Sequence, residues 1–213
     1  MLNDMNSLLH IYYNGFSIGT EVNYIALIVA ILIVGFIFFF HKRHHFMADS
    51  IDLTLDTRIL NCTYHVERNY DNLEIAHRIY TELVTRKAAI PIDPDQDVIN
   101  EIYDSWYTLF KITREEIKTL SGKSLKDDNS DELVKMSIDI LNKGLRPHLT
   151  AYQAKFRKWY AEELEKEDNL GKCPQEIQKE YPDYDELIKS MKDVNDLLVQ
   201  YSEKLNTFIR TTK

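Results

Sequence analysis

Residues that interrupt regular structure are scarce in this sequence. Its 213 residues include six glycines and five prolines. Because these two residues break helices and strands, and because Leu, Lys, Glu and Ile are frequent, the composition predicts long helices. Alternation of apolar and polar residues is confined to Ile51–Leu55, which is too short to build a sheet alone. We therefore expect an all-α protein.

Cysteine and net positive charge are also lacking. The two cysteines, Cys62 and Cys173, form no Cys-x-x-Cys motif and are expected to be reduced, structural or incidental. There are 26 basic and 34 acidic side chains, which gives a net charge of −8. Since phosphate contacts need a positive surface, this balance disfavours general nucleic-acid binding.

Charged side chains are missing from one long stretch, residues 25–40. As a helix, residues 24–40 would rise about 25 Å at ~1.5 Å per residue, close to the hydrocarbon thickness of a bilayer. Aromatic residues lie at both ends of the stretch, where they favour the membrane interface. The sequence predicts a transmembrane helix at 22–40, with a buried core helix as the alternative.

The flanks of this stretch differ in charge. Residues 1–21 contain no Lys or Arg, whereas Lys42 and Arg43 follow the apolar run directly. Cationic residues are retained on the cytoplasmic side, so we expect Lys42 and Arg43 at the membrane interface, in contact with the lipid bilayer. The interpretation is a signal anchor of the inner membrane, single-pass, with the N-terminus outside and the C-terminal domain cytoplasmic.

Four segments follow from these patterns. They are a short extracytoplasmic arm at 1–21, the transmembrane helix at 22–40, a basic juxtamembrane connector at 41–56, and a helical bundle at 57–213.

The bundle is expected to be an up-and-down arrangement of about four long helices. The first helical pattern runs from about 57 to 90, with an apolar face made by Val66, Tyr70, Leu73, His77, Tyr80 and Val84. A second follows Asp93-Pro94 and buries Ile102, Trp106, Leu109 and Thr113. A loop is predicted at 121–130, then helices over 131–143 and from Pro147.

The last helix has the most regular pattern. Its apolar residues are spaced four and three apart without interruption: Leu187, Met191, Val194, Leu198, Tyr201, Leu205 and Phe208. Such a heptad seam suits packing inside an antiparallel bundle or a coiled coil with another chain. Self-association through this helix is therefore one expectation.

Motifs for catalysis or metal binding are incomplete. Gly122-Lys123-Ser124 lacks the upstream glycine of a phosphate-binding loop, since Ile117 stands there. Glu74-x-x-His77 has the spacing of a di-iron ligand pair but no second copy. Asp93-x-Asp95-x-Asp97 lacks the glycine and glutamate of a calcium loop. We predict no enzyme activity, no cofactor, no metal and no small-molecule substrate.

One segment, 144–160, concentrates cations and large aromatic residues in an otherwise acidic domain. Arg, Trp and Tyr are enriched where proteins bind one another. The predicted partner-binding residues are Arg146, His148, Lys155, Arg157, Lys158 and Trp159. The alternative is that Phe156 and Trp159 belong to the core while the cations are solvated.

Two stretches carry a resemblance. Residues 143–165, with the sequence GLRPHLT followed by FRKWY, and the region from Pro174 to Leu198 are similar to uncharacterised, membrane-anchored helical proteins of bacteria, some encoded among defence genes. The resemblance implies no activity and no catalytic residues.

The sequence thus predicts a membrane-anchored helical module that binds other proteins as an anchor or scaffold, as part of a bacterial defence complex. The alternative is a membrane-perturbing effector whose helical domain senses a signal and whose spans oligomerise. An enzyme with a site dispersed along the sequence is a third hypothesis.

Overall fold

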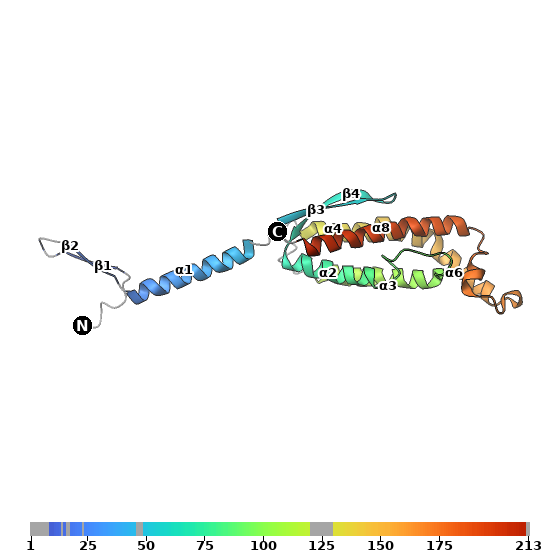
Figure 1. Cartoon of the computed structure of the whole chain (residues 1–213), viewed down its shortest axis with the longest axis horizontal. Helices are drawn as coiled ribbons and strands as arrows, with labels where there is room; N and C mark the ends of the chain where they lie inside the picture. Colours follow the sequence, from blue (N-terminus) through green and yellow to red (C-terminus); the bar gives the residue numbers. More distant parts are fainter. Residues whose placement is uncertain are drawn as a thin grey trace. The chain divides into compact units, whose positions relative to one another are not determined.

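The computed structural model describes residues 9–13, 15, 18–22, 24–45, 49–119 and 130–211. The chain divides into two compact units, residues 1–48 and 49–213 (Figure 1). Most of the loop predicted at 121–130 lies outside the described residues.

The first unit contains a hairpin and a helix. Strands β1 (Leu9–Tyr13) and β2 (Ile18–Val22) pair antiparallel within the segment predicted as an arm. Gly15 lies between them at φ 85°, a left-handed conformation that glycine adopts without steric cost. Helix α1 (Tyr24–His45) follows, and its described apolar side chains, such as Leu32 and Phe38, are exposed.

Within the described part of the chain, no helix is both long enough and apolar enough to cross a membrane. This finding contradicts the transmembrane helix predicted at 22–40. The signal anchor and the single-pass inner-membrane location are contradicted with it.

The second unit begins with a hairpin, so the all-α prediction is wrong. Strands β3 (Asp49–Asp56) and β4 (Asn61–Arg68) pair antiparallel, with Leu53 opposite Tyr64. The short alternation at 51–55 continues in β4, where Tyr64 and Val66 are buried. An isolated hairpin is marginally stable, but this one buries its apolar face against helices and is stabilised by that packing.

Two helices follow the hairpin. Helix α2 (Tyr70–Val84) replaces the second half of the long helix predicted from 57, and it buries Ile75, Ile79 and Leu83. The predicted face is only partly correct. Tyr70 and His77 are exposed, whereas Leu73 and Tyr80 are partly buried and pack against the core. Helix α3 (Ile99–Lys118) buries the four predicted residues Ile102, Trp106, Leu109 and Thr113.

A long helical run then extends from 130 to 164. It comprises α4 (Ser130–Asp139), the π-helix η2 (Ile140–Leu145), α5 (Arg146–His148), the π-helix η3 (Leu149–Gln153) and α6 (Ala154–Leu164). Pro147 lies inside this run rather than at the start of a new helix. Proline lacks the N–H of a regular helical bond, and the wider π turns next to it keep the chain helical.

The chain ends in its longest helix. After the 3₁₀ turn η4 (Glu167–Asn169) and the short α7 (Pro174–Gln178), helix α8 spans Tyr184–Arg210 and runs along the bundle beside α2, α4 and the hairpin (Figure 1). All seven residues of the predicted heptad seam are buried within this chain. A helical bundle is therefore confirmed, and the seam packs inside one molecule.

Candidate protein-binding groove on helix α8

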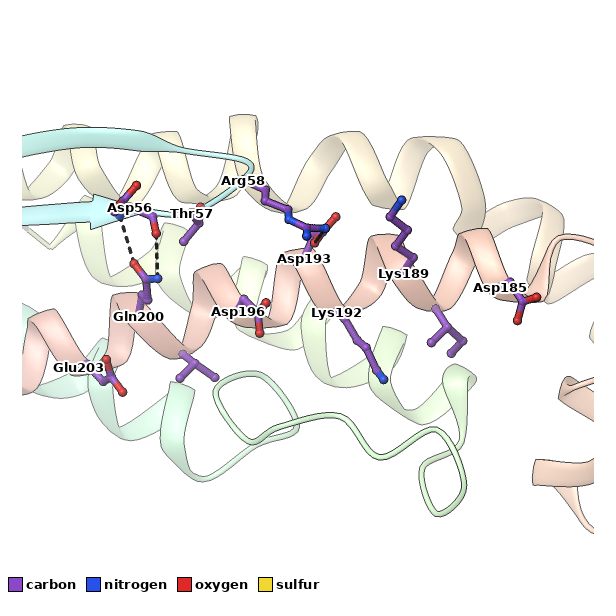
Figure 2. Close-up of a pocket in the computed structure, with 12 residues that line it drawn as sticks. Asp56, Thr57, Arg58, Asp185, Lys189, Lys192, Asp193, Asp196, Gln200 and Glu203 are labelled. Atoms are coloured by element: carbon purple, nitrogen blue, oxygen red, sulfur yellow. Dashed lines mark hydrogen bonds and ion pairs between the residues drawn. The ribbon is translucent and has the colours of Figure 1, made fainter.

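A groove of about 760 Å³ lies along the outward face of α8, next to the turn of the β3–β4 hairpin (Figure 2). Most of its lining comes from α8, and the remainder comes from the end of β3 and the turn. The lining residues are Asp56, Thr57, Arg58, Asp185, Ile188, Lys189, Lys192, Asp193, Asp196, Val199, Gln200 and Glu203. We call these residues the α8 groove.

The amphipathic pattern of α8 places these residues opposite the core. Asp185, Lys189, Lys192, Asp196 and Glu203 recur at helical spacing and are exposed. Because a helix repeats every ~3.6 residues, burial of the heptad seam forces these positions outward. The groove therefore follows from the same pattern that builds the core.

Two polar contacts join the hairpin to α8. Gln200 accepts a hydrogen bond from the Asp56 backbone N–H at 3.1 Å and donates one from Nε2 to the Asp56 carbonyl at 2.9 Å (Figure 2). Arg58 in the turn forms an ion pair with Asp193 of α8 at 3.4 Å. The end of β3 and the hairpin turn form the wall of the groove, and α8 forms its floor. These contacts fix the wall to the floor.

Most of the residues that line the groove are charged. Five acidic side chains (Asp56, Asp185, Asp193, Asp196, Glu203) and three basic ones (Arg58, Lys189, Lys192) line it, a net charge of −2. Small-molecule pockets are concave and mostly apolar, with a few placed polar groups. An elongated, open and charged groove instead suits the surface of another protein.

The structure divides the predicted partner-binding cluster. His148 is 4% exposed and lies in the core. Its Nε2 is 3.2 Å from the Tyr103 hydroxyl and its Nδ1 is 2.8 Å from Ser190 Oγ. Burial lowers the pKa of His148 to about 4, so the ring is neutral at pH 7. His148 joins α5 to α3 and α8 from inside the bundle.

Aromatic residues of the same cluster also belong to the core. Trp159 is half-buried and packs edge-on against Tyr181, with ring centroids 5.0 Å apart. Phe156 is fully buried and stacks on Tyr160. Arg157 is half-buried and donates to Asp104 of α3. These contacts favour the alternative in which the aromatic residues of 144–160 stabilise the fold.

The remaining cations of the cluster are on the surface. Arg146 lies over the Phe110 ring at 5.0 Å and donates to Asn142. Lys155 is exposed, and Lys158 is exposed and 3.7 Å from Glu162. Figure 2 draws none of these residues because they lie outside the α8 groove. The side chains of Lys42 and Arg43, predicted at the membrane interface, lie outside the described residues.

The incomplete metal motifs have other contacts. Glu74 forms an ion pair with Arg78, one helical turn on. Asp97 forms one with Lys87 at 2.8 Å, and Asp95 one with Lys179 at 2.6 Å. Over the described residues, no group of three or more His, Cys, Asp or Glu side chains could hold a metal ion. The residues Gly122-Lys123-Ser124 lie outside the described part of the chain.

The sequence interpretation missed Gln200 and Asp56. Gln200 is a polar residue on the outward side of a seam, a position with no distinctive pattern. Its role depends on a contact between residues 144 positions apart. The signal that pointed to Asp56 was the alternation at 51–55, which was judged too short to build a sheet, although it is part of a strand that ends at Asp56.

Comparisons with known proteins give no further guide. No family model, no curated protein and no solved structure matches this chain.

Proposed function

We propose that this protein is a helical protein-interaction module, a scaffold that binds a partner through the α8 groove. The observation that carries the proposal is the groove itself, in which a 19-residue length of one helix, Asp185 to Glu203, and the end of a hairpin present a continuous charged surface. Complementary charges across an interface set specificity and accelerate association.

Rigidity of the groove supports this role. Its floor is α8, whose opposite face is anchored by the buried heptad seam. Its wall is tied to the floor through Gln200 and through the Arg58–Asp193 pair. A surface that is fixed before binding loses little conformational entropy when a partner docks.

Site-specific crosslinking in cells tests the proposal. A photoreactive residue replaces Asp196 on the groove in the full chain, and a matched one replaces Lys158 on the exposed side of α6. We expect a discrete crosslinked protein from position 196 and none from position 158. The double reversal Asp185→Lys with Glu203→Lys, at two exposed carboxylates of the groove, should abolish the crosslink without changing the helical circular dichroism. Equal crosslinking from both positions, or none from position 196, would refute the proposal.

A further inference from the structure

The edge of strand β3 that faces away from β4, its outer edge, indicates how a partner binds. β3 pairs with β4 along one edge only. Gln200 bonds both the N–H and the carbonyl of Asp56, which shows that these two groups point away from β4. In an antiparallel pair, residues alternate between those bonded to the partner strand and those facing away.

The same alternation places three more residues with their backbone groups outward: Ser50, Asp52 and Thr54. The turn agrees with this assignment, because the Thr57 N–H donates to the Leu60 carbonyl at 3.1 Å, so the residue after Asp56 bonds across the hairpin. Among the described residues, no hydrogen bond joins the backbone groups of these three residues to a neighbour on the outer side. The outward N–H and C=O groups of Ser50, Asp52 and Thr54 are therefore available to pair with an additional strand.

Gln200 already shows what fits this edge. A side-chain amide carries one carbonyl and an N–H donor, the same pair of groups as a peptide unit. By bonding to both groups of Asp56, Gln200 takes the place that the peptide of a neighbouring strand would take. Figure 2 shows this amide rising from α8 to the end of β3.

We infer that the outer edge of β3 binds an extended, cationic peptide segment of a partner protein as an added strand. The inference rests on the proposed function and names the chemistry of its partner. Strand addition obtains affinity from main-chain hydrogen bonds and specificity from alternate side chains. The α8 groove begins where this edge ends, at Asp56 and Gln200, and offers a surface over which the partner chain continues.

The charge of the edge selects the occupant. Asp52 and Asp56 project from β3 and are exposed, and Glu203 of α8 is the exposed carboxylate next after Gln200 on the groove. Within the hairpin, Asp52 Oδ1 lies 2.5 Å from Nδ1 of His65. The nearby Arg58 is already paired with Asp193 of α8. Lysine or arginine on an incoming strand would complement these carboxylates.

A second copy of this chain fits the edge less well. Pairing β3 with its own copy around Asp52 would bring two Asp52 carboxylates together, and like charges opposite one another destabilise a sheet. Acidic residues on an edge are a known means of preventing such self-pairing. On the opposite edge, on β4, one outward backbone group is already occupied, because Asn72 Nδ2 donates to the Glu67 carbonyl.

The test uses the full chain and a seven-residue peptide that alternates lysine and valine. Amide hydrogen exchange is measured with and without saturating peptide. We expect the amides of Asp52 and Thr54 to exchange rapidly in the unbound protein and at least about tenfold more slowly with peptide. The amides of Leu53 and Leu55, which bond to β4, should be protected in both states.

Matched proline variants separate the two edges. Thr54→Pro removes an outward N–H that bonds to nothing in the hairpin, and proline is tolerated at such edge positions. Thr63→Pro makes the same change on β4, where the residue also faces outward and lies opposite Thr54. Thr54→Pro should weaken peptide binding about tenfold, since one or more hydrogen bonds are lost, and Thr63→Pro should change it less than about twofold.

Matched peptides test the backbone and the charge on the unaltered protein, so that a misfolded variant does not decide the result. N-methylation of the amides on one edge of the peptide should remove binding, as should replacement of its lysines by glutamates. The inference is overturned if neither change matters, if Asp52 and Thr54 gain no protection, or if ultracentrifugation shows a dimer that Thr54→Pro dissociates. If the crosslink from position 196 forms in the unaltered protein and persists in Thr54→Pro, while the peptide protects no amide of β3 in the unaltered protein, the proposed function stands and strand addition is wrong.

Discussion

The two faces of α8 are built from one regular sequence but obey different physical constraints. The inner face buries Leu198 and Tyr201 and holds its polar groups in fixed hydrogen bonds. The outer face presents Lys189, Lys192 and Asp196 to solvent. The inner face determines whether the protein folds, whereas the outer face can change without loss of the fold. Function that depends on the outer face should therefore be separable from stability.

The largest effect is expected for the core of the seam. Leu198→Ala removes a fully buried side chain and should lower the free energy of unfolding by about 3 to 4 kcal/mol, through lost burial and a residual cavity. Urea denaturation followed by circular dichroism measures this. Val199→Ala, one residue on and part of the α8 groove, is the matched control and should cost less than about 1 kcal/mol. Equal losses would show that the two faces do not differ.

Acidification tests the polar part of the inner face. His148 has a pKa of about 4 when folded, against 6.5 for the unfolded chain, so the unfolded state binds the proton more readily. Its stabilising contribution is complete above pH 6.5 and is lost as the pH falls from there to about 4. The loss should reach about 3 kcal/mol, at 1.36 kcal/mol per pKa unit.

The measurement for His148 is the free energy of unfolding at pH 7, 5 and 4, in the wild type and in His148→Gln. Other groups titrate in both proteins, so the difference between the two curves isolates His148. We expect that difference to shrink as the pH falls. A difference independent of pH would mean that His148 is accessible to solvent when folded.

A smaller loss is expected at Asn195. This buried side chain accepts from the Ile92 N–H at 3.1 Å and donates to the carbonyls of Ala88 and Ile90 at 2.7 and 3.0 Å. It thereby anchors the segment between α2 and α3. Asn195→Ala leaves these backbone groups unpaired and should cost about 2 kcal/mol. Thermal unfolding checks this, with the half-buried Asn206 replaced by Ala as control.

The smallest change in stability is expected on the outer face. Asp196→Lys alters an exposed side chain with no described ion pair and should change the free energy of unfolding by less than about 0.5 kcal/mol. The same substitution should weaken capture of a cationic peptide, because it removes a negative charge from the α8 groove. Fluorescence anisotropy with the lysine–valine peptide measures the binding. Unchanged binding would place the partner surface elsewhere.

Sequence patterns identified several elements of this fold. The uninterrupted four-and-three spacing at Leu187–Phe208 defined both the length and the buried face of α8. The apolar positions of α3 were also identified, from Ile102 to Thr113. Both helices have a strong amphipathic pattern. Such a pattern depends only on the local periodicity of the sequence, so it can be recognised without knowledge of the tertiary contacts.

Other elements could not be deduced in this way. Residues 61–68 fit a helical reading as well as a strand, and their pairing with β3 depends on support from α4 and α8. The burial of His148 and the continuity of the helix through Pro147 depend on π turns that no propensity predicts. Trp159 packs against Tyr181, in the chain just before α8, a contact between separate segments that residue spacing does not reveal.

The sequence by itself determined where long helices form and which face of α8 is apolar, because helical periodicity is a local property of the chain. Only the tertiary structure decided that the seam closes within one molecule, that Gln200 caps the edge of β3, and that a charged groove lies beside that edge. These features join residues more than a hundred positions apart, and their energies depend on packing that no single segment contains.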